Sequence, residues 1–209
     1  MNRKIILIST IVAFAIATIA VLSLYNSKTE ANNEFLVRDY SPTYGSNEAK
    51  VVLVEFFDPA CGTCAQFAPL IKELVKENEN RLKVVYRYAP LHKNSDIVVM
   101  FLELARNQGI SFDEALNTLL SNQNLWVQNH VANAELAARL LEREVGFDVQ
   151  KANLEIKTVW DTVSQDIDDM NALNISKTPT FFVNGNPLQK FGYNELKELI
   201  DSEIKKAYK

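Results

Sequence analysis

Hydrophobic positions along the chain form runs whose spacing predicts strands near both ends of a globular region and helices between them. The segment "KVVLVEFF", residues 50–57, is β-branched and aromatic, which predicts a buried strand. After Asp58-Pro59, apolar residues recur at helical spacing as far as the charged run "KENEN", and residues 81–90 form a second apolar run. Strand, helix and strand in this order predict a right-handed βαβ unit with parallel strands.

The middle of the chain, residues 95–173, repeats apolar residues every three or four positions, so we expect an almost purely helical region. Trp126 and Trp160 fall on apolar faces and are expected in the core. Gly146 should end one helix. Helix starts are expected at Ser95-Asp96, at the capping box of Ser111 with Glu114, at Asn133, and at Asp148, where a longer helix begins.

Strand patterns return near the C-terminus. The segment "TPTFFVNGNPL", residues 178–188, predicts a β-hairpin that turns at Asn184-Gly185. Asn194 is expected to cap a closing helix with one apolar face. The predicted order is therefore βαβ, a helical insert over about residues 95–173, and ββα, which is an α/β fold.

The first 25 residues differ from the rest of the chain. Arg3 and Lys4 precede an uncharged apolar run, residues 5–25, which has about the length that spans a bilayer. This length favours an uncleaved signal anchor over a cleaved signal peptide, and both readings stay open. Either one places residues 34–209 in the periplasm or on the extracytoplasmic face, behind a polar tether at residues 26–33. In the anchor reading, the chain is tethered to the cytoplasmic membrane.

Charge and cysteine count narrow the possible functions. The net charge of −4 and the pI near 5.3 argue against nucleic-acid binding, which calls for a basic face. The only cysteines, Cys61 and Cys64, would close too short a loop for a bridge to add much stability. Zinc needs about four ligands in close pairs, and only His92 and His130, far apart in sequence, could join the cysteines. The explanation that remains for the two cysteines is a redox-active pair.

The spacing of the two cysteines fits that chemistry. Asp58-Pro59 ends the strand, so Cys61 is expected at a helix N-terminus, where unpaired N–H groups and the helix dipole stabilise a thiolate. Cys64 follows about one turn later, within disulfide reach. We expect an exposed, acidic Cys61 that attacks a substrate disulfide and a shielded Cys64 that resolves the mixed disulfide.

Several residues together resemble the thioredoxin superfamily, specifically its exported DsbA-like branch. The motif "CGTC" follows the strand, and Glu55 stands six residues before Cys61, where this family carries a buried acid. Pro69 matches the proline that kinks the active-site helix, and Thr178-Pro179 matches the cis-proline loop. The helical insert is similar to the DsbA-like layout, and the resemblance covers residues 34–209.

The resemblance implies a thioredoxin-like fold and a protein-disulfide oxidoreductase that needs no bound cofactor. Cys61 would be the nucleophile, Cys64 the resolving thiol, and Glu55 a buried proton carrier for Cys64. Pro179 would be cis, and the backbone of Thr178 would pair with the substrate. The expected partners are protein thiols or disulfides and a membrane redox protein, and a monomer is the default.

Three departures leave the redox direction open. Gly62-Thr63 replaces the histidine-containing pair of strongly oxidising members, Asp58 places a carboxylate near the thiolate, and threonine precedes the cis-proline. Oxidase, isomerase and reductase directions all stay possible. A different class of function is also open, namely a membrane-tethered peptide-binding module in which the cysteines are dispensable. His92 follows a strand end and lies either near the active-site face or in an ordinary loop.

Overall fold

The fold is built on a five-stranded mixed sheet. The computed structural model describes residue 18 and residues 34–209. The strand order is β1-β3-β2-β6-β7, with β2 and β3 parallel and every other neighbouring pair antiparallel. Helix α2 connects the two parallel strands, so the predicted βαβ unit is confirmed. The strands are β1 (Thr43–Gly45), β2 (Val51–Phe57), β3 (Leu82–Tyr88), β6 (Thr180–Val183) and β7 (Asn186–Pro187).

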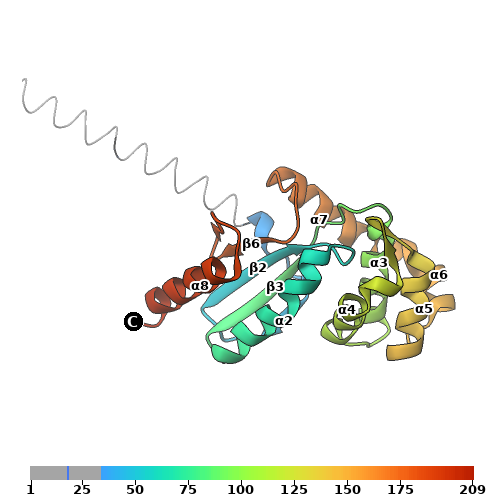
Figure 1. Cartoon of the computed structure of the whole chain (residues 1–209), viewed down its shortest axis with the longest axis horizontal. Coiled ribbons are helices and arrows are strands. Elements are labelled where there is room, and N and C mark those ends of the chain that lie inside the picture. The colour runs from blue at the N-terminus through green and yellow to red at the C-terminus, as the bar shows by residue number, and fades with distance from the viewer. Residues whose placement is uncertain (1–17, 19–33) are drawn as a thin grey trace, which may run out of the picture.

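Helices cover both faces of this sheet, as Figure 1 shows. Helices α2 (Gly62–Glu77) and α8 (Tyr193–Ala207) share one large apolar cluster with alternate residues of β2, including Leu53 and Phe57. Val54 and Phe56, on the opposite face of β2, belong to a smaller cluster with Met170 of α7 (Trp160–Ala172). This alternation is the side-chain period of a strand that is buried on both faces.

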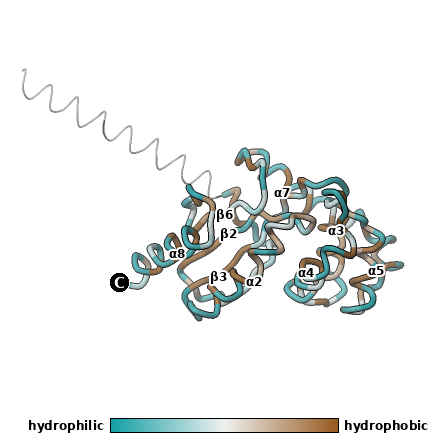
Figure 2. The backbone as a smooth tube through the Cα atoms, viewed as in Figure 1, coloured by the Kyte–Doolittle hydropathy of each residue, from teal (hydrophilic) through white to brown (hydrophobic). Residues whose placement is uncertain are grey.

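The insert packs beside the sheet as a helical layer, and Figure 2 shows hydrophobic and hydrophilic stretches alternating along its helices. The thioredoxin-like fold with a helical insertion is therefore confirmed. One part of the insert is not helical, because strands β4 (Val127–Gln128) and β5 (Val131–Ala132) pair as a short hairpin. Its other helices are α3 (Ser95–Asn107), α4 (Phe112–Ser121), η1 (Gln123–Leu125), α5 (Ala134–Val145), α6 (Val149–Glu155) and η2 (Ile156–Val159).

Some predicted helix ends are confirmed. The side chains of Asn133 and Asp148 accept hydrogen bonds from the N–H groups of Leu136 and Lys151, which starts α5 and α6. Gly146 ends α5 with φ +74°, a left-handed conformation that costs glycine little. The hairpin at Asn184-Gly185 is also present between β6 and β7.

Other predicted ends are wrong. Asn94, and not Ser95, is the N-cap of α3, because the Ser95 hydroxyl bonds elsewhere. Ser111 is the N-cap of α4, but its side chain makes no capping hydrogen bond, so the predicted capping box is absent. Gly192, and not Asn194, is the N-cap of α8.

The long helix predicted after residue 148 is also wrong. The 3-10 segment η2 separates α6 from α7. The change of helical period turns Trp160 outward, so that 46% of it is exposed instead of lying in the core. Trp126 is buried as predicted, and its indole N–H donates to the Leu119 carbonyl.

A buried ionic cluster joins the insert to the sheet. Arg87 of β3 is fully buried and bonds Asp166 and Asp169 of α7 at 2.8 and 2.5 Å. The guanidinium of Arg38 also donates a hydrogen bond to Asp169, and Asp166 accepts a further hydrogen bond from the Tyr88 N–H. Since each buried carboxylate has a cationic partner, the charges compensate one another across the interface.

The predicted membrane segment, residues 5–25, and the tether at residues 26–33 lie outside the described residues, apart from Thr18. Within the part of the chain that the structure describes, no helix is both long and apolar enough to cross a membrane.

Candidate active site

Cys61 lies at the predicted helix N-terminus. Strand β2 ends at Phe57, a tight turn follows in which the Cys61 N–H donates to the Asp58 carbonyl at 3.0 Å, and α2 begins at Gly62. Cys61 is the N-cap, with φ −80° and ψ 119°. Cys64 is the third residue of the helix, so both sulfurs belong to its first turn, next to the free N–H groups.

The two thiols are free and differ strongly in acidity. A hydrogen bond from Cys64 lowers the pKa of Cys61 to about 5; burial opposes this, while Thr178 and the backbone N–H groups of Cys64 and Thr63 add to it. Burial, and then the hydrogen bond to Cys61, raises the pKa of Cys64 well above its ordinary value. The two thiols therefore differ in acidity in the predicted sense.

Cys61 is much less exposed to solvent than predicted. Only 6% of Cys61 is exposed, compared with 1% of Cys64. Cys61 instead lines a cavity of about 440 Å³, together with Gln66 of α2 and residues from three other parts of the chain. A substrate sulfur would reach it through this cavity.

Glu55 lies beneath the cysteines on the face of the sheet that α2 covers. Its neighbours in the sheet are Tyr86 of β3 and Phe181 of β6, and only 3% of it is exposed. Burial, with a smaller effect of the Cys61 charge, raises the pKa of Glu55 to about 8. Among the described residues it forms no ion pair.

The loop before β6 faces the cysteines. The peptide bond between Thr178 and Pro179 is cis, as predicted. The sulfur of Cys61 lies 3.3 Å from the Thr178 carbonyl oxygen. Because β6 pairs with β2, with Thr180 opposite Phe56, the sheet register itself brings this loop to the end of β2 from which Cys61 follows.

Two histidines complete the cavity wall. His92 and His130 both line it, and their rings stack with centroids 5.7 Å apart. Of the two positions left open for His92, it occupies the one near the active-site face. His130 is an exposed residue in the β4–β5 turn, where Asn129 and His130 have φ +50° and +62°. Asparagine and histidine tolerate such angles better than most residues, which is the only sequence hint of this turn.

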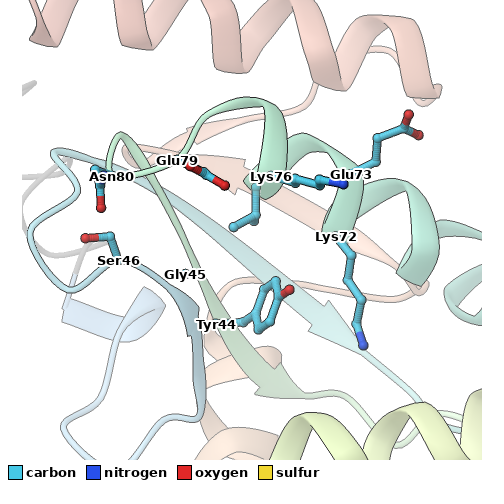
Figure 3. A pocket seen from close by; sticks show the side chains of 9 residues that line it. Tyr44, Gly45, Ser46, Lys72, Glu73, Lys76, Glu79 and Asn80 are labelled. Carbon is cyan, nitrogen blue, oxygen red and sulfur yellow. The ribbon is translucent and has the colours of Figure 1, made fainter.

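A second, larger cavity carries no comparable chemistry. It has about 760 Å³ and lies between β1 and the C-terminal half of α2, as Figure 3 shows, with Tyr44 beside Lys72. Neither cysteine lines this cavity. Among the described residues, no cluster of three or more His, Cys, Asp or Glu side chains could hold a metal ion.

Comparison with known proteins agrees with this geometry. The family model described as thioredoxin matches residues 38–202. A Bacillus cereus protein named "Probable disulfide bond formation protein D" is 26% identical over 210 residues, which are 96% of this chain and 95% of that protein.

Two solved structures share the fold. Oxidised BdbD from Bacillus subtilis has a TM-score of 0.68 at 24% identity, over 79% of this chain and 93% of its own. The α-DsbA1 protein from Wolbachia pipientis has a TM-score of 0.69 at 20% identity, over 85% of this chain and 97% of its own.

Proposed function

The chain belongs to the thioredoxin family as a DsbA-like member, and we propose that it is a thiol–disulfide oxidoreductase that exchanges disulfides with protein substrates through Cys61 and Cys64. The observation that carries this proposal is the split in acidity within one helical turn. Cys61 has a pKa of about 5, while the pKa of Cys64 is raised well above its ordinary value. A nucleophile that is ionised at neutral pH beside a partner that stays protonated is what dithiol exchange requires.

In the reductive half-reaction, the Cys61 thiolate attacks a substrate disulfide, forms a mixed disulfide and releases one substrate thiolate. Cys64 then attacks the Cys61 sulfur, which breaks the mixed disulfide and releases the second substrate thiolate. Cys64 must lose a proton for this step. Glu55, with its pKa near 8, serves as the proton carrier, and it returns the proton to Cys64 when the reaction runs backward.

The Thr178-Pro179 loop is the substrate-binding element of this proposal. The Thr178 carbonyl faces the Cys61 sulfur, so an extended substrate segment that pairs with this backbone would place its own sulfur at Cys61. We propose no bound cofactor, because the two sulfurs carry both electrons.

Substitution of each cysteine tests the activity. Cys61→Ala should abolish turnover in insulin reduction and in oxidative refolding, because no nucleophile remains. Cys64→Ala should accumulate mixed disulfides with client proteins, since Cys61 can still attack but nothing resolves the product. Full activity of Cys61→Ala would end the proposal.

The alternative is a peptide-binding module without turnover, which the position of the Thr178 backbone at the cavity also supports. Alkylation of Cys61 separates the two functions. A pure binding module keeps its affinity for partner peptides after alkylation, whereas the oxidoreductase loses all exchange.

Export belongs to this proposal as well. Residues 1–25 would act as a signal anchor or signal peptide and residues 26–33 as a tether, which leaves residues 34–209 as an extracytoplasmic domain. In such a compartment the enzyme would act as a monomer and exchange electrons with a membrane redox partner. Protease treatment of intact cells or spheroplasts, compared with lysed cells, tests this placement.

A further inference from the structure

A buried carboxylate next to the active site holds one of the two histidines in a fixed orientation. Asp58 is fully buried, and its side chain accepts hydrogen bonds from the N–H groups of Ala60 and His92, both at 2.8 Å, and from the Ser95 hydroxyl at 3.0 Å. Its Oδ2 also lies 2.8 Å from Nδ1 of His92. Because the other three contacts of this side chain are donated to it, Nδ1 is placed to donate as well, and a ring that is protonated at Nδ1 alone has its lone pair on Nε2.

The histidine ring lies on the wall of the cavity that Cys61 lines. The His92 side chain is 19% exposed and lines the same cavity as Cys61. Its ring stacks on His130 at an interplanar angle of 27°. The hairpin that carries His130 is itself fixed to the His92 loop, since the Ala132 N–H donates to the Lys93 carbonyl at 3.0 Å.

This arrangement is not needed to ionise Cys61. The main groups that lower the pKa of Cys61 are Cys64, Thr178 and the N–H of Thr63, and neither imidazole is among them. Lys177 lines the same cavity, and Lys93 follows His92 in sequence. An ammonium group attracts a thiolate but has no lone pair to accept a proton.

We propose that His92, oriented by Asp58 and stacked on His130, is the general base that accepts the proton of an incoming substrate thiol. The proposal rests on the proposed oxidoreductase function and specifies its substrate as a thiol that is protonated at neutral pH. In this step His92 would be the catalytic residue, because its Nε2 would take the proton directly from the thiol, while Asp58 is a positioning residue.

The step balances in atoms and electrons. The substrate S–H bond breaks and its proton moves to Nε2 of His92, while the substrate sulfur attacks Cys61 and the Cys61–Cys64 bond breaks. Cys64 leaves with the bonding electron pair and takes a proton from Glu55. A second substrate thiolate then attacks the first substrate sulfur and releases the Cys61 thiolate, so that two electrons pass from the substrate dithiol to the enzyme disulfide.

Two small thiols of different acidity test this role in the oxidised full chain at neutral pH. One is 2-mercaptoethanol, which is mostly protonated, and the other is thionitrobenzoate, which is fully ionised. The variant His92→Asn keeps an amide N–H near the Nδ1 position for Asp58 but has no counterpart of Nε2. We expect it to react with mercaptoethanol about 100-fold more slowly than wild type, and with thionitrobenzoate at a rate within about twofold of wild type.

A modification of the folded protein gives a second test that does not depend on refolding. The chain has only two histidines, so in His130→Gln the reagent diethylpyrocarbonate can modify only His92 among imidazoles. The same selective loss of the mercaptoethanol reaction, with recovery after hydroxylamine, is expected.

The outcomes are distinct. Equal slowing with both thiols, or slowing with neither, overturns the general-base role of His92. Cys61→Ala should react with neither thiol. If wild-type protein also reacts with neither, the proposed oxidoreductase function itself is overturned.

Discussion

At the scale of single residues, Glu55, Cys61 and Cys64 show how one buried region shifts three acidities in different ways. Burial raises the pKa of Glu55 and Cys64, because neither has a cation nearby to stabilise its charged form. Burial also acts on Cys61, but hydrogen bonds to its sulfur, the largest from Cys64, lower its pKa by more than burial raises it. The direction of each shift therefore depends on donors within a few ångströms and not on burial alone.

Alkylation of Cys61 should follow its lowered pKa. In the reduced chain, the iodoacetamide rate should be half-maximal near pH 5 and level off well below pH 8. Cys64→Ala removes the largest cause of the lowered pKa, so it should move the midpoint upward by about one pH unit or more, whereas Cys64→Ser keeps a donor and should move it less. Thiolate ultraviolet absorbance gives an independent titration. A wild-type midpoint near 9 would contradict the structure.

Glu55 should make the stability of the chain depend on pH. Its pKa is about 8 in the folded state against 4.5 for the ordinary side chain, so the folded state binds the proton more tightly. The contribution of Glu55 to stability should therefore fall as the pH rises from 4.5 to 8, while the lowered pKa of Cys61 contributes in the opposite direction in the reduced chain. The effect of Glu55 is therefore the difference between wild type and Glu55→Gln. Glu55→Gln removes this loss. We expect the free energy of unfolding of the variant to exceed that of wild type by on the order of a few kcal/mol at pH 8 and to differ little from it at pH 4.

Urea unfolding of the reduced proteins across this pH range measures the effect. Unfolding free energies of the two proteins that run parallel from pH 4 to 8 would show that Glu55 is not perturbed. The same variant should slow the resolution of mixed disulfides, so stability and activity should change in opposite directions.

At the scale of elements, the ionic cluster between β3 and α7 fixes the end of the insert to the sheet. Asp166 accepts from Arg87, from the Tyr88 N–H and from the Tyr40 hydroxyl. Asp166→Ala leaves a buried guanidinium with one carboxylate fewer, and we expect a loss of about 3–5 kcal/mol in the free energy of unfolding. Urea titration measures this loss.

An exposed ion pair serves as the control for that measurement. Lys197 and Glu77 lie 2.7 Å apart, and their side chains are 37% and 44% exposed. Lys197→Ala should cost less than about 1 kcal/mol. If the two substitutions cost the same, the buried cluster does not anchor α7.

The elements that could be predicted from the sequence are those with a local physical cause. The apolar run of β2, the helical spacing of α2 and the Asn184-Gly185 turn each specify their structure within a few residues. The missed features depend on distant partners. Ser95 lost its expected cap role because Asp58, far away in sequence, accepts its hydroxyl, and nothing local indicates that Arg87 is buried.

The residues of the candidate site also divide into those that local sequence predicts and those that depend on distant contacts. The positions of Cys61 and of the Thr178-Pro179 bond follow from a strand end and a motif, and both could be predicted. The place of His130 could not, because it depends on a hairpin of two-residue strands within a region whose composition predicts helix. Its contact with His92 appears only when the insert is packed against the loop after β3.

At the scale of the whole molecule, four separate parts of the chain meet at one cavity. Cys61 comes from the first βα connection, His92 and His130 come from the loop after β3 and from the insert, and Thr178 comes from the loop before β6. In Figure 1 the insert stands beside the sheet at the end where α2 begins. The insert therefore forms one wall of the site, and changes to its packing should alter exchange without touching the cysteines.

The redox potential is the property of the whole molecule that decides the direction of electron flow. A nucleophile with a lowered pKa stabilises the reduced state and makes the disulfide more oxidising. A pKa of about 5 lies between those of thioredoxin, about 7, and DsbA, about 3.5. We therefore expect a potential between about −270 and −120 mV, measured by equilibration with a glutathione series.

The pH dependence of this potential gives a sharper test, because it counts protons. Between pH 5 and 8 the reduced pair should hold one thiolate and one thiol, so reduction takes up one proton for two electrons and the potential should fall by about 30 mV per pH unit. Below pH 5 both thiols are protonated and the slope should double. A slope of about 59 mV per unit up to pH 8 would mean that Cys61 stays protonated, and the division of roles between the two cysteines would then have no physical basis.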